Sequence, residues 1–225
     1  MTGVKDQNNC GICAAESVTA GMESQILLNK KEEYKDKDKD NAPDLSESHL
    51  FFCSGHYCKT GADFESLLTF AKNTGVTNEE FFPFEEKTFD ICKLKDGWND
   101  PENLTFVKEW TPAKGDDGIM RAVVENGPVC AGMTVFLDFQ MYKEGIYYHI
   151  WGPPIGGHGV LIVGYGEEKK KHCWSRKKRY WICKNSWSAD WGETGYFRID
   201  FGECNIGKGY PAYSLRLDFK KKEEN

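Results

Sequence analysis

The sequence predicts an α+β protein with a helical first half and a β-rich second half. Up to about residue 106 the chain carries helical periods and N-cap signals, and from about Val107 it carries short runs of β-branched and aromatic residues between glycines. No internal repeat joins the halves. We therefore expect one domain made of a helical lobe over 1–106 and an antiparallel β lobe over 107–225, with a substrate cleft between them.

Each helix expected in the first lobe has its own signal. Residues 13–28 place apolar side chains at close to a helical period and contain no proline. Ser46 is an N-cap candidate for a short helix, and residues 63–73 put four apolar side chains on one face. Between the first two helices, residues 29–44 are charged, low in complexity and closed by a proline, which indicates an exposed loop.

The second lobe is expected to begin with a helix and to continue with strands. The helix, over 117–125, ends at an Asn-Gly-Pro sequence. The runs expected to form strands are 129–135, 145–149, 159–163, 180–184 and 195–200. A basic, hairpin-like insertion at 169–179 is expected to be a solvated face, with docking of an acidic partner or a pro-segment as the alternative.

Composition and charge limit the classes of partner. The 225 residues are 40% hydrophobic and 14% aromatic, which is enough for a buried core and argues against disorder. A formal charge of -6 offers no general attraction to nucleic acid or to an anionic membrane. No apolar stretch approaches the ~20 residues that span a bilayer. We expect neither a nucleic-acid nor a membrane partner.

Two residues could supply the reactive groups for acyl transfer by a thiol. That chemistry needs a thiolate, an imidazole, a group that orients the imidazole and a donor for the oxyanion. Cys13 falls in the first turn of the expected helix, where the helix dipole and the backbone N–H groups lower a thiol pKa. His158 lies between glycines just before a predicted strand, so few side chains crowd its ring.

Two amide side chains complete the set. Asn185 follows the strand expected at 180–184, and its oxygen would accept the second N–H of the His158 ring. Gln7 precedes Cys13 by six residues and would place its NH2 group beside the Cys13 backbone N–H.

The motifs around these residues resemble the papain-like cysteine peptidases. In the family's order, the chain carries QNNCGIC at 7–13, LSE at 45–47, GHG at 157–159, KNSW at 184–187 and WGETGY at 191–196. The resemblance implies the papain-like two-lobed fold and a cysteine endopeptidase that needs no cofactor and no metal. It makes Cys13 the nucleophile, His158 the general acid and base, Asn185 the orienting residue and Gln7 part of the oxyanion hole.

Other residues receive roles through the resemblance alone. It implies disulfides between Cys10 and Cys58 and between Cys53 and Cys92, and it leaves Cys130, Cys173, Cys183 and Cys204 without an assignment. Trp187 would shield the hydrogen bond between Asn185 and His158 from water. Thr60 and Gly61 would bond an extended peptide backbone. The main specificity pocket would have few intruding side chains, with Asp63 near its mouth, a residue around Gly209 at its far end, and walls formed by Gly132, Gly156, Gly157 and Gly159.

Partners and location follow from the same resemblance. We expect a monomer that acts on polypeptides, with a pro-segment or a protein inhibitor as a further occupant of the cleft. Nine cysteines fit an oxidising, secreted or lysosome-like compartment. The start MTGVKDQ lacks the pattern of a secretion signal, so a signal and a pro-segment are expected to have been cut away. The chain between Gly61 and Cys92 is too short for the blocking loop of the family's exopeptidases, which favours an endopeptidase.

Two departures from the family pattern keep alternatives open. The family usually has Ser or Ala before the nucleophile and an aromatic residue after it, whereas this chain has Ile12 and Ala14. These residues motivate the alternative of a weak or inactive homologue that binds peptides or a partner protein. A peptide ligase, which transfers the acyl group to an amine, would use the same residues.

Two metal-site hypotheses also arise from the sequence. A zinc site would use Cys10 and Cys13 with ligands from 53–58, although a second Cys-x-x-Cys is lacking. The alternating aspartates of 36–40 are spaced as calcium ligands can be, but the required glycine and distal glutamate do not follow. Structural cysteines and a solvated loop are therefore the preferred interpretations.

Overall fold

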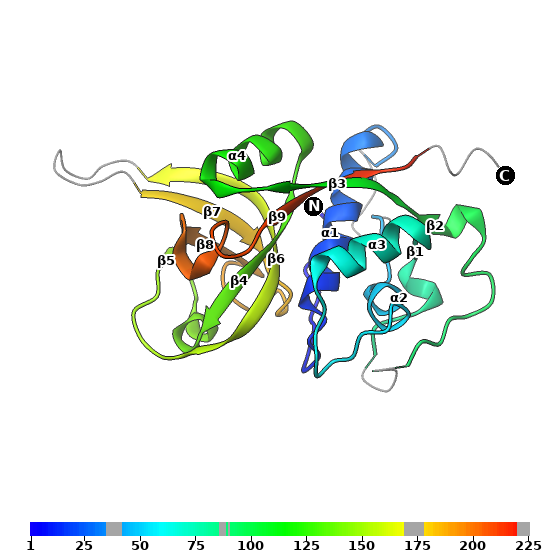
Figure 1. Ribbon diagram of the computed structural model, residues 1–225, viewed down its shortest axis with the longest axis horizontal. Helices are drawn as coiled ribbons and strands as arrows, with labels where there is room; N and C mark the ends of the chain where they lie inside the picture. Colours follow the sequence, from blue (N-terminus) through cyan, green and yellow to red (C-terminus); the bar gives the residue numbers. More distant parts are fainter. Residues whose placement is uncertain (35–41, 86–88, 90, 169–177, 220–225) are drawn as a thin grey trace. The chain divides into compact units, whose positions relative to one another are not determined.

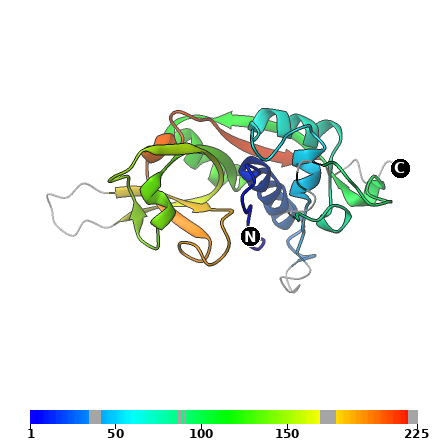
Figure 2. The same ribbon diagram turned by 90° about the horizontal axis from the view of Figure 1, so that it is seen from below.

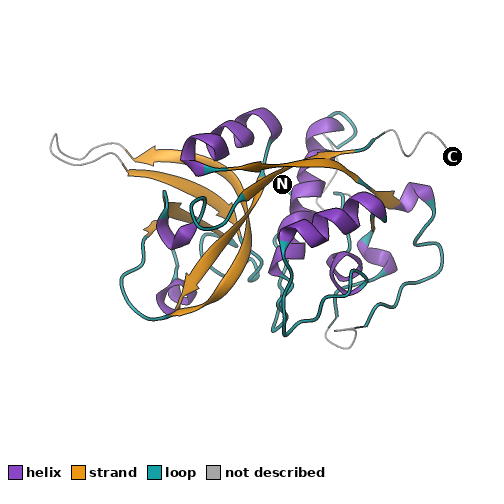
Figure 3. Ribbon diagram, in the orientation of Figure 1, coloured by secondary structure: helices purple, strands orange, loops and turns teal. Residues whose placement is uncertain are grey.

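The computed structural model describes residues 1–34, 42–85, 89, 91–168 and 178–219, and it divides the chain into two compact units (Figure 1). The helical unit comprises Met1–Gly3, Gln7–Thr111 and Leu215–Asn225; the β unit comprises Val4–Asp6 and Pro112–Ser214. The sequence had placed its boundary between residues 106 and 107. Helices dominate the first unit and strands the second, so the expected α+β class is confirmed (Figure 3).

The helical unit is built around a buried central helix. Helix α1 (Cys13–Asn29) packs against α2 (Glu47–Phe52) and α3 (Phe64–Asn73), and every residue from Ala14 to Ile26 is buried (Figures 1 and 2). The helical period of the apolar residues therefore does not mark one buried face, because polar residues such as Glu16 and Glu23 are buried as well. A short antiparallel pair, β1 (Val76–Thr77) and β2 (Leu104–Thr105), completes the unit.

Side-chain caps fix the starts of the two shorter helices. Ser46 accepts a hydrogen bond from the His49 backbone N–H at 3.0 Å and caps α2, as the sequence predicted. Asp63 accepts from the Ser66 backbone N–H at 2.9 Å and caps α3. The expected helix at 13–28 is also confirmed, and it extends one residue further to Asn29.

The described residues of the β unit contain most of a seven-stranded sheet, one α-helix and two short 3₁₀ helices. The strand order is β3-β9-β4-β6-β7-β8-β5. Helix α4 (Gly115–Asn126) ends at Gly127, whose φ of 88° is one that glycine adopts readily. The strands are β3 (Val107–Ala113), β4 (Val129–Phe136), β5 (Ile146–Tyr147), β6 (Pro154–Glu168), β7 (Lys178–Lys184), β8 (Tyr196–Asp200) and β9 (Ala212–Leu217).

The sheet differs from the expected one in three respects. Strand β6 begins at Pro154 and not at residue 159, so His158 lies within a strand and not just before one. Strands β3 and β9, which contribute residues to both units, were not predicted. The sheet is also not wholly antiparallel, because β5 pairs with β8 in parallel, Ile146 opposite Arg198. The expected antiparallel lobe is therefore confirmed for most of the sheet, and the parallel β5–β8 pair at its edge was not anticipated, since β5 is too short for its direction to be predicted from a pattern.

Aromatic rings fill the core of the β unit. The Phe139 side chain is fully buried, and its ring centroid lies 4.9 Å from that of Phe197 and 5.1 Å from that of Trp191. Trp181 is also fully buried and stacks on Phe201 at 3.9 Å. Rings of this size bury ~150–250 Å² each, so they dominate the packing behind β4, β6 and β7.

Two predictions fall wholly or partly outside the described residues. The aspartates of 36–40, considered as calcium ligands, lie in the undescribed 35–41, and most of the basic insertion lies in 169–177. Within the described part of the chain, no helix is long and apolar enough to cross a membrane. The same described residues contain no group of three or more His, Cys, Asp or Glu side chains arranged to hold a metal ion.

Candidate active site

Cys13 is the first residue of α1, directly after a cross-linked turn. The Cys10–Cys58 disulfide closes this turn, and the Gly11 N–H donates to the Cys58 carbonyl oxygen at 2.9 Å. A Cβ on Gly11 would lie 2.6 Å from that oxygen, so the turn requires glycine. Cys13 is half-buried, and its position gives the thiol the positive end of the helix dipole.

Gln7 belongs to the same unit and lies at the start of the same turn. Its Nε2 donates to the Cys10 carbonyl oxygen at 2.9 Å, while the Cys10 N–H donates to the Gln7 carbonyl oxygen at 3.1 Å. The side chain is therefore held against the backbone that leads into α1. An amide NH2 has two N–H groups, and this hydrogen bond uses one of them.

His158 and Asn185 form a buried hydrogen-bonded pair in the β unit. His158 is on β6, Asn185 directly follows β7, and His158 Nε2 lies 2.7 Å from Asn185 Oδ1. The Ser186 backbone N–H donates to the same Oδ1 at 2.9 Å. A flipped amide would turn its NH2 toward this donor, so Oδ1 is fixed as the acceptor and Nε2 must carry a proton.

Trp187 covers this pair with an aromatic surface. Its ring centroid lies 4.9 Å from that of His158, at an interplanar angle of 33°. Contacts of 5.5 Å to Phe139 and 5.1 Å to Trp191 hold the indole against the core. His158 is 7% exposed and Asn185 3%, so water has little access to the hydrogen bond between them.

A match to a known protein family agrees with this arrangement of side chains. The sequence pattern described as papain family cysteine protease matches residues 1–213. The chain belongs to the papain family of cysteine proteases. The resemblance seen in the motifs is thereby confirmed.

Relatives and solved structures of the papain family support the assignment. The chain is 33% identical to Cathepsin B-like CP3 of Giardia intestinalis over 214 residues, 90% of this chain and 66% of that protein. It is 33% identical to procathepsin L of Felis catus over 210 residues, 88% of this chain and 57% of that protein. Digestive procathepsin L 3 of Tenebrio molitor superposes with a TM-score of 0.75 at 27% identity, over 96% of this chain and 67% of that one. The papain fold is confirmed, and the chain spans about three fifths of these two relatives' length.

Thr60 and Gly61, which the papain-family resemblance assigned to peptide binding, lie in one turn of the helical unit. The Gly61 N–H donates to the Tyr57 carbonyl oxygen at 3.1 Å, and Gly61 has a φ of 68°. Thr60 is exposed beside it. The Asp63 carboxylate caps the N-terminus of α3. Burial raises the pKa of this carboxyl, but hydrogen bonds from Ser66 outweigh burial, so the pKa is lowered overall.

The glycines that were expected to form the pocket lie on paired strands of the β unit. Gly132 on β4 is opposite Gly159 on β6, and the pairs Thr134–Gly157 and Val135–Gly156 follow. The Tyr210 side chain lies directly on Gly132. Sequence reasoning did not name this residue and gave only an unspecified one around Gly209. The available signal was Gly132 itself, since a glycine inside a strand often marks a close approach by another group.

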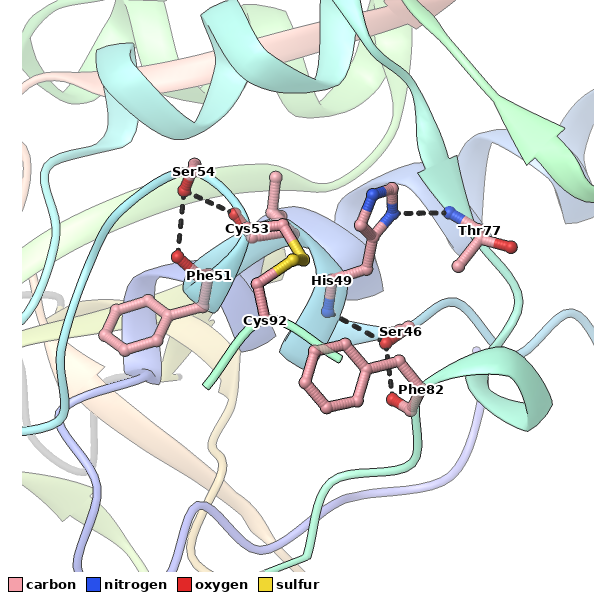
Figure 4. The surroundings of a disulfide bond; sticks show 9 residues. Ser46, His49, Phe51, Cys53, Ser54, Thr77, Phe82 and Cys92 are labelled. Atoms are coloured by element: carbon pink, nitrogen blue, oxygen red, sulfur yellow. Dashed lines mark hydrogen bonds between the residues drawn. A yellow bond between two sulfur atoms is a disulfide. The ribbon is translucent and has the colours of Figure 1, made fainter. Parts of the chain in front are cut away.

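A second disulfide and a buried histidine organise the lower part of the helical unit. Cys53 and Cys92 are bonded beside α2 (Figure 4). In the same view the Thr77 N–H donates to His49 Nδ1 at 3.1 Å, and burial lowers the pKa of His49 to about 4. His49 is therefore a neutral acceptor at physiological pH. Both disulfides are the pairs that the resemblance implied, and they occupy cysteines that a zinc site would need.

Among the cysteines in the described residues, four are not in a disulfide: Cys13, Cys130, Cys183 and Cys204. Burial raises the pKa of Cys183 well above its ordinary value. Burial, followed by the nearby Glu203 charge, raises the pKa of Cys204 to about 12. These two thiols stay protonated at neutral pH and are poor nucleophiles.

Proposed function

We propose that this papain-family chain is a cysteine endopeptidase that works through a thiolate–imidazolium pair of Cys13 and His158. The observation that carries the proposal is the 2.7 Å contact of His158 Nε2 with Asn185 Oδ1. This hydrogen bond uses Nε2 to orient the imidazole ring. Nδ1 is therefore the ring nitrogen that exchanges a proton with the thiol and the substrate. The position of Cys13 at the start of α1 supports its role as nucleophile.

In the first half of the reaction, the Cys13 thiolate attacks the carbonyl carbon of the scissile peptide bond. A C–S bond forms, and the carbonyl π electrons move onto oxygen. The Cys13 backbone N–H and the Gln7 amide stabilise this oxyanion. His158 then gives its Nδ1 proton to the leaving nitrogen, the C–N bond breaks, and an acyl-enzyme thioester and an amine remain.

In the second half, water replaces the amine. Neutral His158 takes a proton from the water through Nδ1, and the water oxygen attacks the thioester carbon. Collapse of the intermediate breaks the C–S bond, which releases a carboxylic acid and restores the thiolate and the imidazolium. Asn185 keeps the ring in one orientation through both proton transfers, and Trp187 excludes water from their hydrogen bond.

The proposal extends to substrates, activation and location. Polypeptides are the substrates, and Thr60 and Gly61 bind their backbone. Several relatives are named as precursors, procathepsin L among them, which supports maturation from a precursor whose pro-segment occupies the same cleft. The disulfides support an extracytoplasmic, secreted or lysosome-like site of action. We propose that the enzyme acts as a monomer.

The competing function is a homologue that binds peptides without cutting them. It was motivated by Ile12 and Ala14, and both residues are buried in the helical unit, Ile12 completely. Their packing is therefore part of the fold around α1, and nothing in it replaces the thiol. A peptide ligase uses the same groups and differs only in the acceptor of the acyl group.

Covalent labelling distinguishes these functions. A peptidyl vinyl sulfone or epoxide should modify Cys13 stoichiometrically, and mass spectrometry of the digested protein should find the adduct on that residue alone. Cys13→Ala should abolish labelling and hydrolysis with an unchanged unfolding midpoint, while Cys130→Ala is the matched thiol control and should remain labelled. Hydrolysis by Cys13→Ala would refute the mechanism, and absence of labelling in the wild type would favour the inactive homologue. Product analysis with an added amine separates hydrolase from ligase.

A further inference from the structure

Asn103 begins an Asn-Leu-Thr sequence with Leu104 and Thr105. This is the acceptor pattern for N-linked glycosylation, in which any residue except proline stands between Asn and Ser or Thr. No other asparagine in the sequence is followed by this pattern. The chain therefore offers one position for a glycan, and the fold decides whether there is room for it.

Asn103 lies in an exposed turn of the helical unit. It is the last residue of a 3₁₀ helix, η4 (Pro101–Asn103), and directly precedes β2, which lies at one margin of this unit (Figure 1). The residues before it, 99–102, are exposed, and Asn103 itself is partly exposed. A glycan needs such a position, because a sugar chain is large and strongly hydrated and is costly to bury among side chains.

Hydrogen bonds set the position of the Asn103 side chain. Its Nδ2 donates to the Gly97 carbonyl oxygen at 2.9 Å, and its backbone N–H donates to the Asp100 carbonyl oxygen at 2.8 Å. A side-chain amide NH2 has two N–H groups, and a glycan replaces one of these hydrogens. The remaining N–H can keep the bond to Gly97, so the turn over 97–103 retains the contact that closes it.

Thr105 differs from Asn103, because the fold encloses it. It is 7% exposed, and it lies on β2 opposite Val76 of β1. The transferase has to reach the threonine as well as the asparagine, since both residues define the acceptor. Transfer must therefore take place before β1 and β2 pair, while the chain is still unfolded. Folding then buries the threonine and leaves the modified asparagine at the surface.

We propose that Asn103 is an acceptor site for an N-linked oligosaccharide. The inference rests on the extracytoplasmic location given under the proposed function, because this pattern is modified in secreted proteins. The donor is an oligosaccharide carried on a lipid diphosphate. Asn103 Nδ2 attacks the anomeric carbon of the first sugar and loses one proton to a base of the transferase. A C–N bond forms, the anomeric C–O bond breaks, and the lipid diphosphate leaves with the electron pair of that bond.

Expression of the full chain behind a secretion signal in a eukaryotic cell line tests the site. The wild type and the control Thr105→Ser, which keeps the acceptor pattern, should migrate faster on a denaturing gel after treatment with peptide N-glycosidase. Asn103→Gln and Thr105→Val should show no shift. Thr105→Val retains the Asn103 side chain, so it removes the acceptor pattern and leaves the bond to Gly97. Deglycosylation of the wild type in heavy-oxygen water should convert the residue at position 103 to a labelled aspartate, as found by mass spectrometry.

The outcomes separate this inference from the peptidase proposal. A wild type without a glycan, in the medium and in the cell lysate alike, overturns the site, and so does a glycan that persists in Asn103→Gln. The lysate also reports on a variant that fails to fold, because transfer precedes folding. Vinyl sulfone labelling of Cys13 is measured on the same samples. A glycosylated wild type without this label refutes the peptidase and keeps the site, whereas a labelled wild type without a glycan refutes the site alone.

Discussion

Asn185 Oδ1 lies 2.7 Å from His158 Nε2, and both side chains are almost completely buried beside Trp187. The N–H of Ser186 fixes the orientation of the amide, so the pair sets the tautomer of the imidazole as well as its position. In the proposed mechanism, this arrangement leaves Nδ1 as the ring nitrogen that exchanges protons.

Replacing Asn185 should slow the reaction without weakening substrate binding. A hydrogen bond to a charged imidazolium contributes about 1.5–3 kcal/mol, so Asn185→Ala should lower kcat about ten- to hundred-fold with KM nearly unchanged. Asn185→Asp is the control that keeps an acceptor. Its carboxylate would raise the pKa of His158 and move the alkaline limb of the pH profile upward. An unchanged kcat for Asn185→Ala would remove the pair from the mechanism.

The pH profile of kcat/KM should be bell-shaped with a mildly acidic to neutral optimum. Activity rises on the acid side as the Cys13 thiolate forms, and it falls on the alkaline side as the His158 imidazolium loses its proton. In the proposed pair, the helix dipole and the imidazolium would both lower the thiol pKa below its free value of about 8.5. The two groups would then titrate as a coupled pair. A single rise near the pKa of an ordinary thiol would show that no ion pair forms.

Gln7→Ala should lower turnover and leave apparent substrate binding little changed. Loss of one oxyanion donor typically costs about a hundred-fold or more in kcat. Gln7 also bonds the Cys10 carbonyl, so thermal unfolding of the variant must be measured alongside. If kcat is unaffected in a folded variant, the Gln7 amide is a structural brace of the turn and not an oxyanion donor.

Breaking the Cys53–Cys92 disulfide should destabilise the protein substantially. The bond closes a loop with a sequence separation of 39. In the chain-entropy model a loop of this length stabilises by about 3–4 kcal/mol. The Cys53→Ser and Cys92→Ser double variant should therefore unfold at a clearly lower temperature. Equal unfolding midpoints for the variant and the wild type would contradict stabilisation of the helical unit by this disulfide.

A mild thiol reagent should raise the activity, because it reduces an oxidised Cys13.

Asp138 should make the β unit sensitive to acid. Its Oδ1 accepts from Tyr147 and His149, and its Oδ2 accepts from the Ile150 and Trp151 N–H groups. Burial raises the pKa of this carboxyl, but these hydrogen bonds, that from Tyr147 first, outweigh burial and hold the pKa well below its usual range.

The sign of the pH effect follows from the lowered pKa of Asp138. Its stabilisation is complete above the unfolded carboxyl pKa of about 3.9 and is lost as pH falls from there toward the lower folded pKa. Asp138→Asn should therefore cost about 2 kcal/mol or more at pH 6 and reduce the further loss below pH 4. The exposed Asp190→Asn serves as control. Equal acid sensitivity of both variants and the wild type would exclude Asp138 as the cause.

The helices could be predicted because their signals are local. Ser46 caps α2 through a bond to a residue three positions away, and Asp63 caps α3 in the same way. The turn before Cys13 is less local, because Gly11 lies against the carbonyl oxygen of Cys58 and Cys10 is bonded to the same distant residue. The identities of the candidate catalytic residues also follow from short motifs. What the motifs leave open is geometry, such as the contact of His158 with a residue 27 positions later.

Strands β3 and β9 could not be predicted, because neither has a clear alternating pattern. Strand β3 contains Pro112 and exposes most of its side chains, and its pairing partner lies about a hundred residues away. The parallel contact of β5 with β8 was hidden for a similar reason. Each of these pairings depends on which distant segments of the chain lie side by side after folding, and a local residue pattern does not specify this.

The sequence by itself determined the papain-family motifs, the helix starts and the order of the chemically active groups, since each is written in residues close together in the chain. Only the tertiary structure decided what surrounds those groups. The amide of Asn185 against His158, the four hydrogen bonds to Asp138 and the ring of Tyr210 on Gly132 all join segments that are distant in sequence. These three contacts form only when the strands and loops of the β unit pack closely together. No local residue pattern specifies which distant residues then meet.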